Sequence, residues 1–357
     1  MEQFFEICKF TIITIITCLN KLAYEKRVGV IIMKLAIIGS GKIVHDFLTI
    51  TKDLKDTELT AIIGTKHSQD VLNQLQDQYH INEVFTDFDT ALATGDFDTV
   101  YVAVPNFLHY TFAKKALEQG KNVISEKPFT VKYEEFLDLK ALAEKNQLVL
   151  LEAITNQYLQ NYLDLKKKLP DIGDLKIIES NYSQYSSRYD AFRAGEILPV
   201  FDPKKGGGAL MDINIYNIHL IVGLLGKPEQ VEYLPNIERG IDTSGMLILN
   251  YGTTKVVAIG AKDSTAPIRT VIQGNKGSIV VNGPTNEMDS FNVYDNDKLL
   301  EKINHNIYPH RMYQEFVEFE RIIRENDLEA AEKHLNHSQT VMWVVKEALK
   351  SADLKLD

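Results

Sequence analysis

The fold is decided by one stretch near the start of the sequence, Met33-Lys34-Leu35-Ala36-Ile37-Ile38-Gly39-Ser40-Gly41-Lys42-Ile43-Val44. Its first half is a short apolar run, which is typical of a buried parallel strand. Two glycines then allow a tight turn that a pyrophosphate can approach closely, at the N-terminus of the helix that follows. Because Val44 replaces the third glycine of the usual pattern, a plain strand–helix turn is the alternative. We predict a nucleotide-binding turn made by Gly39, Ser40, Gly41, Lys42 and Ile43.

The same strand-then-helix pattern repeats as far as Ala153. Alternation of this kind predicts a parallel sheet that helices cover on both faces. The fold class is therefore α/β, with a doubly wound Rossmann domain at residues 33–153. The strand-like runs are Leu35–Ile38, Leu59–Ile63, Thr99–Val104, Asn122–Ser125 and Leu148–Leu151, and amphipathic stretches such as Gln69–Tyr79 and Tyr110–Glu118 lie between them.

Residues 154–357 show a different pattern, in which short strand-like runs follow one another across glycine and asparagine turn signals. This pattern predicts an α+β domain with a mostly antiparallel open sheet, which would bind the substrate and form oligomers. Strands are expected at Leu175–Ser186, Gln230–Leu234, Gly245–Tyr251, Lys255–Gly260, Arg269–Gln273 and Ser278–Asn282. Helices are expected at Asp212–Leu225, Tyr313–Arg324 and His337–Ser351.

Composition narrows the class of protein. The length of 357 residues suits about two domains. A net charge of −10 argues against binding to nucleic acid or to an anionic membrane surface. Cys8 and Cys18 are the two cysteines, so residues after Arg27 offer no disulfide framework and no thiolate metal site. This cysteine usage fits a reducing cytoplasm, so we predict a cytoplasmic protein. We also predict that it has no metal site, because no close cluster of histidine and carboxylate ligands stands out.

The first 32 residues do not fit the fold. Phe10 to Leu19 is an apolar run that is too short for a bilayer, which needs about 20 residues. Acidic residues before it and the lack of a cleavage site after it also fit a signal peptide poorly. We expect residues 1–32 to be an upstream or loosely packed extension, with Met33 as the natural start. A membrane-associating helix is the alternative.

The loop after the second strand bears on the choice of cofactor. An NAD site usually carries an acidic residue here to bind the ribose 2′-hydroxyl, but Thr65 and Lys66 occupy the place and Asp70 is the first carboxylate. A hydroxyl and a lysine suit a 2′-phosphate better, which favours NADP over NAD. The alternative is a solvated loop in which Ser68 caps the next helix.

Two more strands end in residues that suit the same crevice, since the carboxyl ends of parallel strands face the ligand. Val104, Pro105 and Asn106 end one strand, with His109 three residues further on. The next strand ends in Glu126-Lys127-Pro128, where the proline keeps Lys127 out of helical geometry. A lysine near a nicotinamide can orient a hydroxyl and shift the pKa of a neighbouring acid. A surface turn is the alternative. We assign Val104, Pro105, Asn106, His109, Glu126 and Lys127 to the cofactor site.

A glycine run, Gly206-Gly207-Gly208, enters the helix that starts near Asp212. Asp212 and Tyr216 are four residues apart and so lie on one helical face. A tyrosine has a reference pKa near 10, so it needs a nearby cation to exchange protons at neutral pH, and Lys127 is the candidate. His219 is predicted to touch the same face, with a packed core histidine as the alternative.

Together these motifs resemble the Gfo/Idh/MocA oxidoreductase family, from Met33 to the C-terminus. The resemblance rests on Gly-x-Gly-x-Ile, Val-Pro-Asn followed by His, Glu-Lys-Pro and Gly-Gly-x-x-x-Asp-x-x-x-Tyr in the right order. It implies that Lys127, Asp212 and Tyr216 are the catalytic residues. A tyrosine at this place is similar to the dihydrodiol dehydrogenase and glucose–fructose oxidoreductase branch of the family.

The predicted activity is reversible hydride transfer between a nicotinamide cofactor and a secondary alcohol or carbonyl of a sugar, polyol or dihydrodiol. Lys127, Asp212, Tyr216 and His219 would bind the substrate, together with Tyr185 and Arg188 unless these two only pack in a loop. The resemblance also implies a homodimer or homotetramer joined through the second domain's sheet. The alternative function is a catalytically inactive, NAD(P)-sensing regulatory protein.

Overall fold

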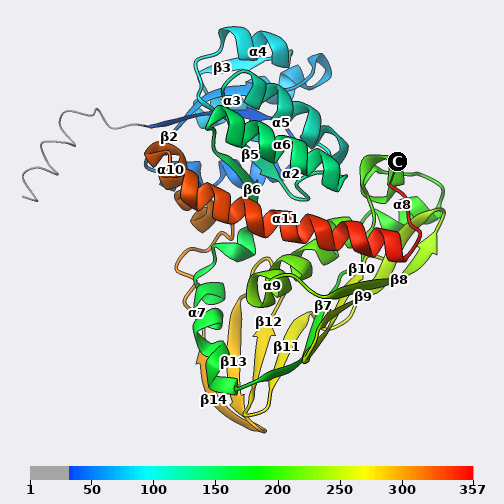
Figure 1. Ribbon diagram of the computed structural model, residues 1–357. Helices are drawn as coiled ribbons and strands as arrows, with labels where there is room; N and C mark the ends of the chain where they lie inside the picture. Colours follow the sequence, from blue (N-terminus) through cyan, green and yellow to red (C-terminus); the bar gives the residue numbers. More distant parts are fainter. Residues whose placement is uncertain (1–31, 357) are drawn as a thin grey trace, which may run out of the picture.

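The computed structural model describes residues 32–356. The expected N-terminal extension, with both cysteines, lies outside the described residues apart from Ile32. Figure 1 shows two layered regions, with a sheet in each and a long helix running between them. Both sheets have the kind of pairing that the sequence predicts, parallel in the first and mostly antiparallel in the second.

The first sheet has six parallel strands in the order β3-β2-β1-β4-β5-β6, which is the arrangement of a Rossmann domain. Apolar side chains form a separate cluster on each face of this sheet, under the flanking helices. The strands are β1 (Met33–Ile38), β2 (Thr57–Ile63), β3 (Glu83–Phe85), β4 (Thr99–Val102), β5 (Asn122–Glu126) and β6 (Leu150–Ala153). The helices are α2 (Lys42–Leu48), α3 (Gln69–Tyr79), α4 (Phe88–Thr94), α5 (His109–Glu118) and α6 (Tyr133–Asn146).

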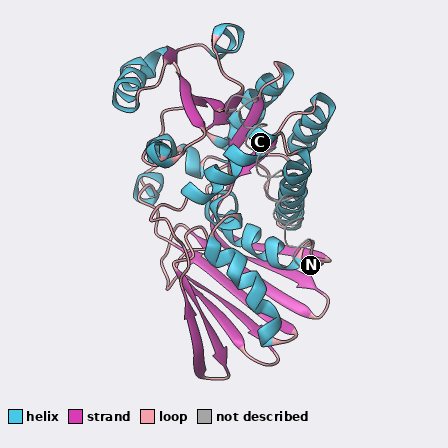
Figure 2. Cartoon of the chain, turned by 90° about the vertical axis from the view of Figure 1, so that its left-hand side faces the viewer, coloured by secondary structure: helices cyan, strands magenta, loops and turns pink. Residues whose placement is uncertain are grey.

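The second sheet has eight strands in the order β14-β13-β12-β11-β7-β10-β9-β8, and only the pairing of β7 with β10 is parallel. Figure 2 shows this sheet with a helix against one face. The strands are β7 (Leu175–Ser183), β8 (Gln230–Glu238), β9 (Ile241–Tyr251), β10 (Thr254–Ala261), β11 (Arg269–Gly274), β12 (Ser278–Asn282), β13 (Ser290–Asp295) and β14 (Lys298–Ile303).

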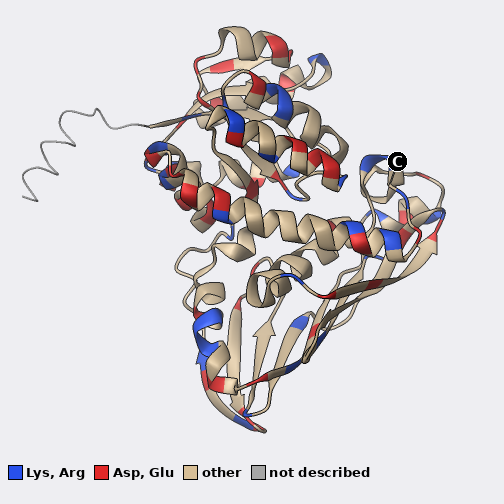
Figure 3. Ribbon diagram, viewed as in Figure 1, with Lys and Arg blue, Asp and Glu red and all other residues tan. Residues whose placement is uncertain are grey.

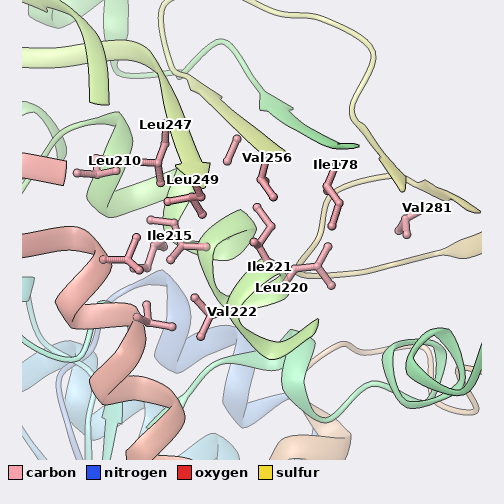
Figure 4. Close-up of a cluster of buried hydrophobic side chains, with 14 of the residues drawn as sticks. Ile178, Leu210, Ile215, Leu220, Ile221, Val222, Leu247, Leu249, Val256 and Val281 are labelled. Atoms are coloured by element: carbon pink, nitrogen blue, oxygen red, sulfur yellow. The ribbon is translucent and has the colours of Figure 1, made fainter. Parts of the chain in front are cut away.

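The covered face of the second sheet packs on α9 (Ile215–Leu225). A π-helical segment, Leu210–Asn214, precedes this helix. Figure 4 shows Leu220 and Ile221 of α9 facing Val256 and Ile178 from the sheet, and Ile215 beside Leu249. All of these side chains are fully buried or nearly so. The remaining short helices of this region are α7 (Gln160–Lys168) and α8 (Tyr189–Arg193).

The two C-terminal helices join the regions. In α10 (Tyr313–Glu325), Phe316 packs on Phe47 and Tyr101 beneath the first sheet, with ring centroids 4.3 and 5.2 Å apart. Helix α11 (Leu328–Ser351) contacts α6 and β6 on one side and α9 and β8 on the other. It starts nine residues before the predicted His337, since Asp327 caps its first turn by accepting a hydrogen bond from the amide of Ala330.

Two surface properties bear on possible partners. Figure 3 shows Lys/Arg and Asp/Glu mixed over α6 and at both ends of α11, rather than gathered into a stripe of one sign. In the described part of the chain, one helical stretch, Pro203–Leu225, is long and apolar enough to cross a membrane. Most of it (72%) is buried within the fold, as expected of a core helix.

Candidate active site

A cavity of about 940 Å³ opens at the carboxyl ends of β1, β2 and β4, where a Rossmann sheet binds its ligand. A Cβ at Gly39, whose φ is +122°, would lie 2.2 Å from the carbonyl oxygen of Ala103. A Cβ at Gly41 would meet nothing within 4 Å, so this glycine leaves the backbone open to the cavity. The turn therefore fits a pyrophosphate. The predicted residues that line this cavity are Gly39, Ser40, Gly41, Lys42, Ile43, Thr65, Val104, Pro105 and Asn106.

The loop after β2 closes on itself. The Thr65 amide donates to the Ser68 hydroxyl (3.0 Å), which in turn donates to the carbonyl oxygen of Thr65 (2.9 Å). Both residues line the nucleotide cavity, whereas Lys66 is exposed beside it and outside the lining. The loop thus presents a hydroxyl to the cavity with an exposed ammonium group nearby.

A second cavity, of about 640 Å³, lies against the first, and Lys42 and Asp212 line both. Lys127, Asp212 and Tyr216 all line this second cavity. The structure therefore brings together the three residues predicted to be catalytic, beside the predicted nucleotide site. We call the two spaces the nucleotide cavity and the catalytic cavity.

Lys127, which directly follows β5, connects the two domains at this point. Its Nζ donates to the Asp212 carbonyl oxygen (2.9 Å) and to Asp212 Oδ1 (3.3 Å). The same Nζ lies 4.6 Å from the centroid of the Tyr216 ring. Asp212 belongs to the π-helical segment and Tyr216 to the first turn of α9, so both reach one lysine.

Charge pairing sets the protonation states of Lys127 and Asp212. Burial lowers the pKa of Lys127, but the charges of Tyr216 and Asp212 outweigh it and raise this pKa above its usual value. Burial raises the pKa of Asp212, but Lys127 and Lys262 outweigh it and hold that carboxyl well below its usual range. The pair is therefore an ammonium and a carboxylate at neutral pH.

The pKa of Tyr216 is raised overall rather than lowered, although the sequence predicted that a nearby Lys127 would lower it. Lys127 does lower it, but burial has the larger effect, and the pKa of Tyr216 lies above 10. The phenol is thus protonated at neutral pH and suited to donate a proton. Any group that adds positive charge to the cavity would make it easier to ionise.

Several residues in or beside the catalytic cavity were not predicted from the sequence. Arg311, between β14 and α10, points a guanidinium to within 3.8 Å of Asp46. Lys262, just after β10, donates to Asp212 Oδ2 at 2.6 Å without itself lining the cavity. No local motif marks either residue. The further lining residues are Tyr182, Gln184, Asn286 and Glu287.

Three residues predicted to contact the ligands are buried in the fold and line neither cavity. His219 is fully buried, and its Nδ1 lies 3.0 Å from Nε2 of His337 on α11. This is the packed histidine of the alternative reading. His109 is also buried, with its ring nitrogens 2.9 and 2.8 Å from the carbonyl oxygens of Pro128 and Val104, so it supports backbone rather than touching ligand. Glu126 is buried against the Tyr101 hydroxyl, 2.5 Å away.

The loop residues Tyr185 and Arg188 separate in the structure. The Tyr185 hydroxyl donates to Asp190 at 2.7 Å, and the ring lies outside both cavities, which corrects its assignment to the substrate. Arg188, predicted to bind the substrate, lines the nucleotide cavity and not the catalytic cavity. Tyr185 thus packs within its loop, as the alternative had it, whereas Arg188 lies beside the nucleotide site.

Comparison with known proteins agrees with this geometry. Residues 33–153 match the model of an oxidoreductase family with an NAD-binding Rossmann fold, and residues 169–280 match the Gfo/Idh/MocA C-terminal domain. The chain is therefore an oxidoreductase with a Rossmann domain of the NAD(P)-binding type.

The relatives place it further. The chain is 35% identical over 321 residues to the scyllo-inositol 2-dehydrogenase (NADP(+)) IolU of Bacillus subtilis, covering 89% of this chain and 96% of that protein. It is 26% identical to the trans-1,2-dihydrobenzene-1,2-diol dehydrogenase of Xenopus tropicalis, over 72% of this chain and 81% of that one. The protein belongs to the Gfo/Idh/MocA family.

A solved structure shows the same fold. KijD10, a 3-ketoreductase from Actinomadura kijaniata in complex with NADP and TDP-benzene, superposes with a TM-score of 0.76 at 20% identity, covering 89% of this chain and 98% of that one. The arrangement of the two sheets is therefore common to proteins of widely different sequence.

Proposed function

We propose that the protein is an NADP-dependent dehydrogenase or reductase that acts on a secondary alcohol or carbonyl of a polyol, sugar or dihydrodiol. The observation that carries this proposal is the meeting of the nucleotide cavity with a cavity that Lys127, Asp212 and Tyr216 line. The names of the inositol and dihydrodiol dehydrogenases that it resembles support the substrate class.

In the reducing direction, Tyr216 is the proton donor. Its protonated phenol gives a proton to the carbonyl oxygen of the substrate, while the Lys127 ammonium stabilises the negative charge that develops there. Asp212 holds Lys127 through its carbonyl and carboxylate oxygens, which fixes the direction of the ammonium. A bound nicotinamide supplies or accepts the hydride. In the oxidising direction, Tyr216 must first be ionised, and its phenolate oxygen then receives the hydroxyl proton.

The preference for NADP rests on the loop after β2. Thr65 and Ser68 line the nucleotide cavity there, Lys66 is exposed beside it, and Asp70 is the first carboxylate of the loop. A 2′-phosphate suits hydroxyl and ammonium donors better than a carboxylate. The relative named an NADP(+) enzyme is consistent with this choice.

We also propose that the second sheet forms an oligomer through its open face. Met246 of β9 pairs with Leu234 of β8 and with Ile259 of β10 on the face opposite α9. Met246 is 44% exposed and Leu234 48%, and Ile177 of β7 adds a further apolar side chain to this face. Exposed apolar side chains gathered on an open sheet face suit a second copy of the chain, as a dimer or within a tetramer. We further propose, from the cysteine usage of the sequence, that the protein is cytoplasmic.

Two measurements test the function. Nucleotide fluorescence, titrated with the protein, should show tighter binding of NADPH than of NADH. Reduction of NADP⁺ should then follow addition of scyllo-inositol or trans-1,2-dihydrobenzene-1,2-diol. Tighter binding of NADH would overturn the cofactor preference alone. Binding of neither nucleotide would overturn the proposed activity.

A further inference from the structure

Asp212 holds two lysines rather than one. Lys127 Nζ lies 3.3 Å from Oδ1 of the carboxylate, and Lys262 Nζ lies 2.6 Å from Oδ2. The lysines come from different domains: Lys127 follows β5 of the first sheet and Lys262 follows β10 of the second. Asp212 is thus the centre of a chain of three charges that crosses the domain boundary.

Lys262 is buried far more deeply than an ordinary surface lysine. It is 2% exposed, and its other polar contact is the carbonyl oxygen of Val200, at 3.0 Å. The ammonium also lies 4.5 Å from the centroid of the Phe201 ring. Burying an ammonium is costly unless a charge and hydrogen bonds compensate it, and Asp212 supplies the nearest carboxylate contact.

We propose that Lys262 is a positioning residue for the reaction, which fixes the Asp212 carboxylate and thereby aims Lys127 at the substrate oxygen. This inference rests on the proposed function. Lys262 does not line either cavity, so it acts through Asp212 rather than by touching substrate or cofactor. With two cations on one carboxylate, the cluster carries a net charge of about +1, which favours an oxygen that gains negative charge.

The charged groups around this cluster define how pH should act on it. Three charged groups act on Lys262: Asp212 of the π-helical segment, Lys127 of the first domain and Asp242 of β9. Removing the charge of Lys262 takes away a cation that holds the pKa of Asp212 down. The two carboxyls that this cation influences, Asp212 and Asp242, should then titrate at a higher pH, so the acidic limb of a bell-shaped pH profile should move upward.

The test compares Lys262→Met with Lys262→Arg, which keeps the positive charge, and with Lys255→Met, which changes an exposed lysine of β10, the strand that Lys262 follows. We expect Lys262→Met to lower kcat about tenfold or more and to move the acidic limb of the kcat/KM profile upward by about one pH unit or more. Lys262→Arg should keep the profile in place, and Lys255→Met should match the wild type. NADPH affinity, measured by fluorescence, should stay within about threefold in all three variants.

A loss of activity in Lys262→Met without movement of the pH profile would overturn the proposal, because it would indicate a purely structural role. A double-mutant cycle with Asp212→Asn provides a second test, which holds even if Lys262→Met alone folds poorly. The double variant removes the charges of Asp212 and Lys262 together, and Lys127 keeps its hydrogen bond to the backbone carbonyl oxygen of residue 212, so the variant should fold. If Lys262 acts through Asp212, adding Lys262→Met to Asp212→Asn should change kcat less than threefold. If the two residues act independently, the fold-losses in kcat of the single variants should multiply in the double variant. Failure of either test with hydride transfer intact would leave the proposed function standing.

Discussion

Replacing Lys127 by methionine removes the one cation of the catalytic cavity that touches both Asp212 and the Tyr216 ring. Methionine has similar length and can fill the space, so packing should change little. Loss of one positioned donor lowers kcat by about 10²–10⁴-fold, which corresponds to about 3–5 kcal/mol in the activation free energy. The structure therefore predicts a large kinetic effect from a single buried charge.

The same structure predicts that this variant folds. The Lys127 side chain is only 15% exposed. Breaking a buried ion pair usually lowers stability, because it leaves one charge without compensation. Here Asp212 keeps Lys262 at 2.6 Å, so the loss of stability should lie within the ordinary range of about 0.5–3 kcal/mol. Lys127 is also outside the lining of the nucleotide cavity, so NADPH affinity should change by less than about threefold.

The assay measures kcat and kcat/KM with saturating NADP⁺, the NADPH dissociation constant by fluorescence, and urea unfolding. Lys145→Met, which changes an exposed lysine of α6, is the matched control and should equal the wild type in all three. Turnover of Lys127→Met near the wild-type value would refute the reasoning and remove Lys127 from the mechanism. Loss of nucleotide binding in a folded variant would instead show that Lys127 belongs to the nucleotide cavity.

Further predictions concern the turn, the open sheet face and the buried histidines. Gly39→Ala should destabilise the fold by at least about 1–3 kcal/mol in urea unfolding, since its Cβ would clash with Ala103, whereas Gly41→Ala should keep stability and lose NADPH affinity; equal stability of the two variants would contradict this. Met246→Asp should shift the mass measured by light scattering to that of a monomer, and an unchanged mass would place the interface elsewhere. Burial, and then His219, hold the pKa of His337 far below 6.5, so the unfolded state binds a proton first as pH falls. Stability should therefore drop below about pH 6.5 by up to ~1.4 kcal/mol per unit, and less in His337→Asn than in the exposed control His67→Asn.

The glycine turn and the strand ends could be predicted from sequence because their signals are local. The positive φ of Gly39 belongs to a turn of a few neighbouring residues, which the sequence displays directly. Lys127 must lie at the crevice because it follows the end of a parallel strand. The sequence also placed Asp212 and Tyr216 near one another by their spacing. What joined them to Lys127 was the fold as a whole, since Lys127 and Asp212 are 85 positions apart.

The residues that were missed or misplaced depend on contacts between distant elements. Lys262 follows an ordinary strand, and its role is visible only when β10 lies beside the π-helical segment. His219 is three residues after Tyr216, but α11 covers it through His337. The edge strand β14 (Lys298–Ile303) was also missed, because five of its six residues are exposed and lysines interrupt any alternation.

The most direct test of the central claim follows the hydrogen itself. The wild-type protein is incubated with NADPH deuterated at the transferable position and with the ketone of scyllo-inositol or another polyol, and the product alcohol is analysed by mass spectrometry. We predict one deuterium on the product carbon, and almost none with Tyr216→Phe or Lys127→Met. Tight binding of NADPH with no label in any alcohol across a panel of polyol, sugar and dihydrodiol ketones would contradict the account and favour a protein that senses the nucleotide without using it.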